Sequence, residues 1–258
     1  MAGDPVDTPV IVPGGDGFFI RQAIDNMAWC DMGDYILVVD ALEDAPLENE
    51  VMAAIADTVG DKPVRFVLNT HTHFDHVSLN GAFVRRFGAE IVNQRTTTIE
   101  AEGRVFQGAE RKVCMIPMPG THTKEDCVIW APDDGVLLVG DIFGWGLIPS
   151  GSLLRGELRS LLRDTYQRLI DFDARIIVPG HGPVCRTAEL VRWVQYFDWL
   201  LETVGGLVAA GKTDREIITS VAPPQDMHSW WRFEAWKHED AVGKVLTSAR
   251  RGVLDDGL

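Results

Sequence analysis

The segment 70–76 constrains this chain more than any other, because it places four side chains that can bind a metal within six positions. It reads Thr-His-Thr-His-Phe-Asp-His, and its candidate ligands are His71, His73, Asp75 and His76. The apolar run 64–68 just before it predicts a buried strand, so the candidates would lie where that strand leaves the core. Imidazole nitrogens and carboxylate oxygens are ligands that zinc and similar first-row metals accept. We therefore expect a metal site at the end of this strand.

Three more apolar runs predict strands that end at residues able to bind a metal. Residues 113–116 lead into a Gly-Thr-His loop, residues 136–139 into Gly-Asp, and residues 175–178 into Pro-Gly-His-Gly. Ligands of open α/β sheets bind at the carboxyl ends of the strands. The candidates are too many for one tetrahedral ion, whereas two neighbouring metals bridged by one carboxylate and one water would use them all. The complete set is His71, His73, Asp75, His76, His122, Asp141 and His181.

The order of elements predicts an α/β fold, because strand and helix patterns alternate over the first 180 residues. From residue 187 onward the pattern is helical, and Thr213 is the expected N-cap of a helix that begins at Asp214. A helix is also expected over 96–105. We expect one domain over 1–258, with a loose lead-in rich in Pro, Gly and Asp at 1–16. Residues 187–258 would form a helical C-terminal extension of the same domain.

Charge and composition exclude several classes of partner. The formal net charge of −14 argues against a nucleic-acid or anionic-membrane surface. The N-terminus lacks the basic start and apolar core of a signal peptide, and no apolar run approaches the roughly 20 residues of a membrane span. The four cysteines are scattered without a Cys-x-x-Cys pair, as is typical of buried thiols in a reducing compartment. We expect a cytoplasmic protein with a small-molecule substrate and no nucleic-acid or membrane partner.

Together the four motifs resemble those of the metallo-β-lactamase-fold hydrolases, in the branch that contains glyoxalase II and the metal-dependent lactonases. The resemblance covers about residues 18–185 and rests on the order and separation of the motifs. It implies an α/β (α+β) fold, a four-layer αβ/βα sandwich of two mixed β-sheets. It also implies that His71, His73 and His122 hold one metal, that Asp75, His76 and His181 hold the other, and that Asp141 bridges the two.

The chemistry expected of such a site is hydrolysis. A hydroxide that bridges two divalent ions would attack the carbonyl of an ester, thioester or lactone. Asp75 would orient this nucleophile and Asp141 would fix the metal separation, so both are predicted to be catalytic. Zinc is the expected metal, and such sites also accept iron or manganese. Two alternatives stay open: a persulfide dioxygenase with one iron, and a binding or sensor protein that retains metal without turnover.

Two aromatic segments are candidates for contacts with substrate or partner. Phe143 and Trp145 follow Asp141 directly, so they would either line the mouth of the pocket as substrate contacts or pack beneath their loop. The segment 230–236 holds three tryptophans and one phenylalanine and favours packing in a core or an interface. We therefore expect a homo-oligomer to form, if one exists, through the aromatic C-terminal helix.

Overall fold

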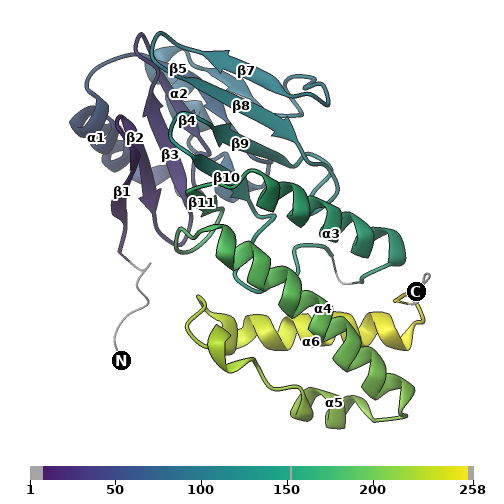
Figure 1. The fold of residues 1–258 in the computed structure, drawn as a ribbon. Coiled ribbons are helices and arrows are strands. Elements are labelled where there is room, and N and C mark those ends of the chain that lie inside the picture. Colours follow the sequence, from purple (N-terminus) through teal and green to yellow (C-terminus); the bar gives the residue numbers. More distant parts are fainter. Residues whose placement is uncertain (1–7, 152, 255–258) are drawn as a thin grey trace. The chain divides into compact units, whose positions relative to one another are not determined.

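The structure is a computed structural model that describes residues 8–151 and 153–254. Its internal contacts divide the chain into two compact units. The first comprises Met1–Pro119, Thr123–Ile142 and Ala174–Arg186, and the second comprises Gly120–His122, Phe143–Asp173 and Thr187–Leu258. The first unit holds both sheets, and the second is helical (Figure 1).

The six-stranded sheet of the first unit has the order β1-β2-β3-β4-β5-β6. Its strands are β1 (Val10–Gly15), β2 (Phe18–Gln22), β3 (Met27–Asp31), β4 (Ile36–Val39), β5 (Val64–Leu68) and β6 (Glu90–Val92). The first four pair antiparallel, whereas β4, β5 and β6 are parallel. The carboxyl ends of β4 and β5 therefore lie at one edge of the sheet, which is where the segment 70–76 begins.

The five-stranded sheet has the order β11-β10-β9-β8-β7. Its strands are β7 (Arg104–Gln107), β8 (Lys112–Pro117), β9 (Cys127–Ala131), β10 (Val136–Gly140) and β11 (Ile176–Pro179). Only β10 and β11 pair parallel, so both sheets are mixed, as expected.

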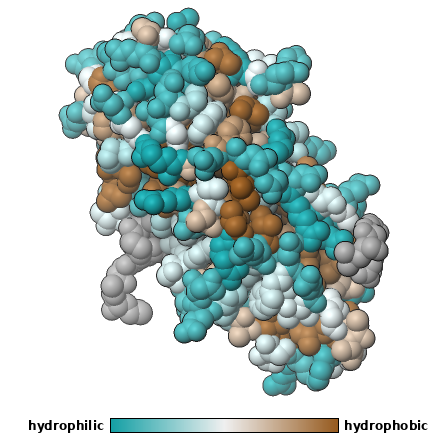
Figure 2. Space-filling view, in the orientation of Figure 1, coloured by the Kyte–Doolittle hydropathy of each residue, from teal (hydrophilic) through white to brown (hydrophobic). Residues whose placement is uncertain are grey.

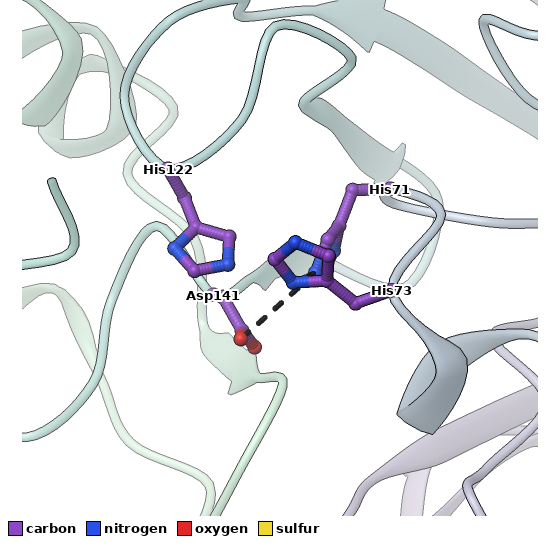
Figure 3. Close-up of side chains that lie close together, drawn as sticks. All are labelled: His71, His73, His122 and Asp141. Atoms are coloured by element: carbon purple, nitrogen blue, oxygen red, sulfur yellow. Dashed lines mark hydrogen bonds and ion pairs between the residues drawn. The ribbon is translucent and has the colours of Figure 1, made fainter. Parts of the chain in front are cut away.

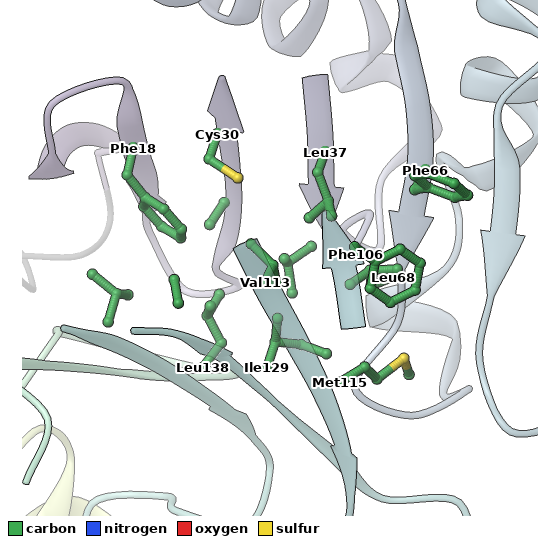
Figure 4. Close-up of a cluster of buried hydrophobic side chains, with 14 of the residues drawn as sticks. Phe18, Cys30, Leu37, Phe66, Leu68, Phe106, Val113, Met115, Ile129 and Leu138 are labelled. Carbon is green, nitrogen blue, oxygen red and sulfur yellow. The ribbon is translucent and has the colours of Figure 1, made fainter. Parts of the chain in front are cut away.

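The two sheets face each other across one hydrophobic core (Figure 4). Leu37 and Val39 of β4 point into this core, whereas their neighbours Ile36 and Val38 point to the opposite face of the sheet. The opposite face is covered by helices α1 (Glu48–Val59) and α2 (Asn80–Phe87), through side chains such as Ile55. A strand buried on both faces must be apolar throughout, which explains the uninterrupted run in β4.

The second unit is built from α3 (Gly156–Asp171), α4 (Thr187–Ala209), α5 (Asp214–Ser220) and α6 (His238–Arg250). The expected N-cap is confirmed: Thr213 and Glu216 form a capping box at the start of α5. Between α5 and α6, a short 3-10 helix (Gln225–Met227) and a π-helix, η4 (Phe233–Lys237), interrupt the regular pattern.

Two local expectations differ from the structure. Within the expected lead-in, residues 1–7 lie outside the described residues, but Val10–Gly15 forms β1 and pairs with β2. Pro13 is tolerated there because β1 is an edge strand. The helix expected over 96–105 is wrong: turns follow Asn93, whose side-chain oxygen accepts from the backbone N–H groups of Arg95 and Thr96, and β7 begins at Arg104.

Hydrophilic residues cover much of the face shown in Figure 2, interrupted by smaller hydrophobic patches. Among the helices of the described chain, none combines the length and the apolar character needed to cross a membrane.

Candidate metal centre

The candidate ligands follow the carboxyl ends of strands. His71 lies three positions after the end of β5, and Asp141 follows β10 directly. His181 lies two positions after β11, the parallel neighbour of β10, so it emerges at the same edge of the sheet as Asp141. The 3-10 helix η2 (Phe74–His76) turns the chain so that His76 is buried, whereas Phe74 is 67% exposed.

Four of the side chains form a first group (Figure 3). His71, His73, His122 and Asp141 each offer one ligand atom, and these atoms lie within 4.8 Å of one another. Nε2 of His71 lies 3.0 Å from Nδ1 of His73 and 3.9 Å from Oδ2 of Asp141. The Nδ1 atom of His122 lies 3.0 Å from the carbonyl oxygen of Pro149, which fixes the orientation of its ring.

A second group lies entirely in the first unit and consists of Asp75, His76, Asp141 and His181. Oδ1 of Asp141 lies 3.3 Å from Nε2 of His76 and 3.3 Å from Nε2 of His181. Oδ2 of Asp75 lies 3.3 Å from the same nitrogen of His181. Asp141 thus belongs to both groups and turns one oxygen toward His71 and the other toward the second group.

Behind the second group lies Asp40, a buried carboxylate that the sequence reasoning did not select. It accepts hydrogen bonds from the backbone N–H and the hydroxyl of Thr70, at 2.8 and 2.9 Å. Its Oδ2 also lies 3.0 Å from Nδ1 of His76. Because a carboxylate accepts, Nδ1 of His76 carries the proton and Nε2 turns toward Asp141. Asp40 follows the apolar strand β4, so the strand-end position that identified the other candidates would also have found it.

Close contact between imidazoles and carboxylates shifts the pKa values of the second group. Burial opposes the charged form of His76, but the charge of Asp40 and the contacts with Asp141 raise its pKa to about 10. Burial likewise opposes charge on His181, and contacts with Asp141, Asp25 and Asp75 raise its pKa to about 12. Burial alone would raise the pKa of Asp141, yet the close imidazoles of His181 and His76 hold it well below its usual range. The carboxylates therefore stay ionised and attract positive charge to the site.

The donor set fits divalent metal ions. Within the described residues, Oδ1 of Asp75 and Nε2 of His76 are buried atoms without a hydrogen-bond partner. A buried polar atom left in this way costs free energy unless another group satisfies it. Imidazole nitrogens and carboxylate oxygens gathered this closely are the ligands of zinc, iron and manganese. Each of the two groups could hold one ion, with Asp141 common to both.

The aromatic loop after Asp141 is packed rather than open. Phe143 and Trp145 are 1% and 8% exposed; both rings contact Trp230 in T-shaped arrangements, and the two contact each other at a tilt. These contacts agree with packing beneath the loop. Their role as substrate contacts stays a prediction.

One family model matches this chain, and several solved structures share its fold. The model of the metallo-beta-lactamase superfamily matches residues 31–113 and 97–181. A metallo-beta-lactamase from Pontibacter korlensis is 16% identical with a TM-score of 0.59, over 71% of this chain and 96% of that one. A stereoselective inverting sec-alkylsulfatase from Pseudomonas sp. is 14% identical with a TM-score of 0.73, over 98% of this chain. This chain spans only 51% of the sulfatase.

A third solved structure, a peroxy diiron species of a chemotaxis sensor, is 13% identical with a TM-score of 0.58, over 73% of this chain and 93% of that one. At these identities the likeness shows the fold. The search of curated proteins finds no match.

Proposed function

Because the chain belongs to the metallo-beta-lactamase superfamily, we propose that it is a dinuclear metal-dependent hydrolase that cleaves an ester, thioester or lactone bond. The observation that supports this proposal most strongly is the position of Asp141, whose carboxylate is shared by two groups of candidate ligands. Two ions held a few ångströms apart by one carboxylate are typical of hydrolytic sites.

We assign the ligands according to the two groups. His71, His73 and His122 would hold one ion, Asp75, His76 and His181 the other, and Asp141 both. Zinc is the proposed metal, and iron or manganese would suit the same donors. When bound, such ions supply a water that is deprotonated near neutral pH and a Lewis acid for the substrate carbonyl.

The side chains themselves have distinct tasks in this proposal. Asp75 is half-buried beside His181, whose hydrogen bond helps to hold the Asp75 pKa below its usual range, against the raising effect of burial. An ionised Asp75 can orient the attacking water and accept its proton. Asp141 would hold both ions and would reduce the positive charge of the site. Asp40 and Thr70 hold His76 in the orientation that this arrangement requires.

Other chemistries are outcomes of the test rather than parts of the proposal. Sulfate ester cleavage is one alternative to be tested, because a sec-alkylsulfatase shares the fold over almost the whole chain. A persulfide dioxygenase with one iron, or a sensor that retains metal, would use overlapping ligands.

We also propose a cytoplasmic location, since the four cysteines are free thiols, as a reducing compartment would keep them. A homo-oligomer through the aromatic C-terminal segment stays a prediction, for which Trp236, 44% exposed, is the available contact.

The test is hydrolysis by the zinc-loaded protein of a panel comprising a simple ester, a thioester, a lactone and an alkyl sulfate. We expect turnover of at least one carbonyl substrate, and a loss of about 100-fold or more in Asp141→Ala. Gly243→Ala, on helix α6, is the matched control and should retain full activity. Turnover of the sulfate alone would replace the proposed substrate class. Oxygen uptake on a persulfide by an iron-loaded protein, without hydrolysis, would overturn the proposal.

A further inference from the structure

Hydrogen bonds join the loop that carries His181 to a second loop, residues 23–26, which connects β2 and β3. The side chain of Asn26 makes two bonds between the loops and one within its own loop. Its amide nitrogen donates to the carbonyl oxygens of Pro179 and Gly182, both at 2.8 Å, and its oxygen accepts from the N–H of Ala23 at 2.9 Å. The backbone N–H of Asn26 also donates to Gly180 at 2.8 Å. Asn26 is only 3% exposed, so its donors and acceptor are satisfied within the protein.

These hydrogen bonds hold the Asp25 side chain in contact with His181. Oδ1 of Asp25 lies 2.9 Å from Nδ1 of His181, and the two residues also form an antiparallel β-bridge. The carbonyl oxygen of Ile24 lies 3.2 Å from the same ring nitrogen. Both neighbours accept, so Nδ1 must donate, and the opposite nitrogen, Nε2, faces Asp75 and Asp141 at 3.3 Å.

We propose that Asp25 is a positioning residue that sets the affinity of the second group for its metal. The inference rests on the proposed function, because it requires an ion at Asp75, His76, Asp141 and His181. A carboxylate behind a ligating imidazole fixes its tautomer, holds its ring orientation and increases its basicity. Asp25 supplies this to His181, as Asp40 does to His76. The two imidazoles of the second group are therefore each supported by a carboxylate from a different loop.

Hydrogen bonding must be distinguished from a general effect of negative charge. Glu43 offers the matched control, because it lies close enough to Asp25, Asp75 and His181 to interact with them electrostatically. It is exposed, and within the described residues it makes no hydrogen bond to His181. Glu43→Gln removes one negative charge near the site and leaves the hydrogen bond of Asp25 in place.

The experiment is a zinc titration of the metal-free full chain in competition with a chromophoric chelator. The proteins compared are the wild type, Asp25→Ala, Asp25→Asn, Glu43→Gln and His181→Ala. We expect Asp25→Ala to weaken one of the two binding events by about 10- to 100-fold. Asp25→Asn keeps an acceptor oxygen without the charge. Its zinc affinity should therefore lie between those of Asp25→Ala and the wild type. The zinc affinity of Glu43→Gln should stay within about two-fold of the wild type. The charge of Glu43 is screened by solvent, and its side chain makes no hydrogen bond to His181.

A second readout is the tautomer of His181, from the ¹⁵N shifts of its ring in the zinc-loaded protein. We expect the proton on Nδ1 in the wild type and in Asp25→Asn. If Asp25→Ala does not fold, Asp25→Asn is the variant whose zinc affinity tests the inference. Unchanged zinc binding in both Asp25 variants, while His181→Ala loses an ion, would overturn the inference and leave the proposed function intact. An equal loss in Glu43→Gln would also overturn it. A wild-type protein that takes up no zinc would overturn the proposed function itself.

Discussion

Gly180 and Asp141 are packed so closely that a Cβ atom at Gly180 would lie 2.1 Å from Oδ1 of Asp141. The same Cβ would lie 2.9 Å from Cε1 of His76. Separations this short are not tolerated, so either the carboxylate or the loop of residues 179–182 would have to move. The absence of a side chain at Gly180 is therefore a condition for the position of the shared carboxylate.

Gly180→Ala should displace Asp141, and we expect it to lower hydrolysis by about 100-fold, as a shift of about 1 Å in a catalytic group can do. Metal content should fall with it. Gly243→Ala is the control, because nothing lies within 4 Å of its Cβ position and the residue is in helix α6. This substitution should raise the stability by about 0.5–1 kcal/mol. A fully loaded and active Gly180→Ala protein would contradict the geometry described for Asp141.

Asp40→Ala should destabilise the metal-free protein by about 3 kcal/mol, as the loss of one partner from a buried charged network does. The substitution leaves the Thr70 hydroxyl and Nδ1 of His76 without their acceptor. Asp40→Asn should cost less, because asparagine retains an oxygen and tolerates the left-handed backbone at this position, where φ is 58°. Urea denaturation followed by circular dichroism measures both changes.

The control for Asp40 is Asp44→Ala, since Asp44 is exposed and makes no side-chain cap on its short helix. It should change the stability by less than about 0.5 kcal/mol. Equal effects at the two positions would mean that the hydrogen bonds of Asp40 do not contribute to the folding free energy.

Cys30 should make the protein less stable in alkali. Burial raises the pKa of this thiol from 9.0 to about 12. Since the folded-state pKa is the higher one, its contribution is fully present below pH 9 and is lost as the pH rises toward 12. The loss approaches about 1.4 kcal/mol per pH unit, because only the unfolded chain releases the proton. The stability difference between the wild type and Cys30→Ala, measured in urea at pH 8 and pH 10.5, should change in favour of the variant. An unchanged difference would show that Cys30 titrates normally.

The strand ends are the part of the site that the sequence predicts best. An apolar run that is abruptly followed by glycine and a polar ligand type can be recognised locally, and in the structure Asp141 and His181 lie at such positions. The two mixed sheets were expected from the resemblance of the four motifs to the metallo-β-lactamase-fold hydrolases, and the structure has them. Helix α2 likewise ends where the sequence has a glycine, since Gly88 adopts the left-handed conformation that closes the helix.

The supporting residues were harder to predict because their partners are remote in the chain. Asp25 and Asn26 contact residues more than 150 positions away, and no local pattern indicates such a pairing. Likewise, Phe233–Lys237 has the composition of an ordinary helix, whereas it is a π-helix in the structure and its Lys237 donates to the remote carbonyl oxygen of Gly144. At β1, proline and glycine indicated a loop, whereas the pairing with β2 overrides this local preference.

The most direct test of the account is the metal content of the wild type and of Asp141→Ala, after zinc loading and removal of excess ion. We predict about two zinc ions per chain in the wild type, since two groups of ligands share one carboxylate. Asp141→Ala should retain clearly less, because both groups lose a ligand. A wild type that binds only one ion, or an Asp141→Ala protein that still binds two, would contradict the dinuclear site.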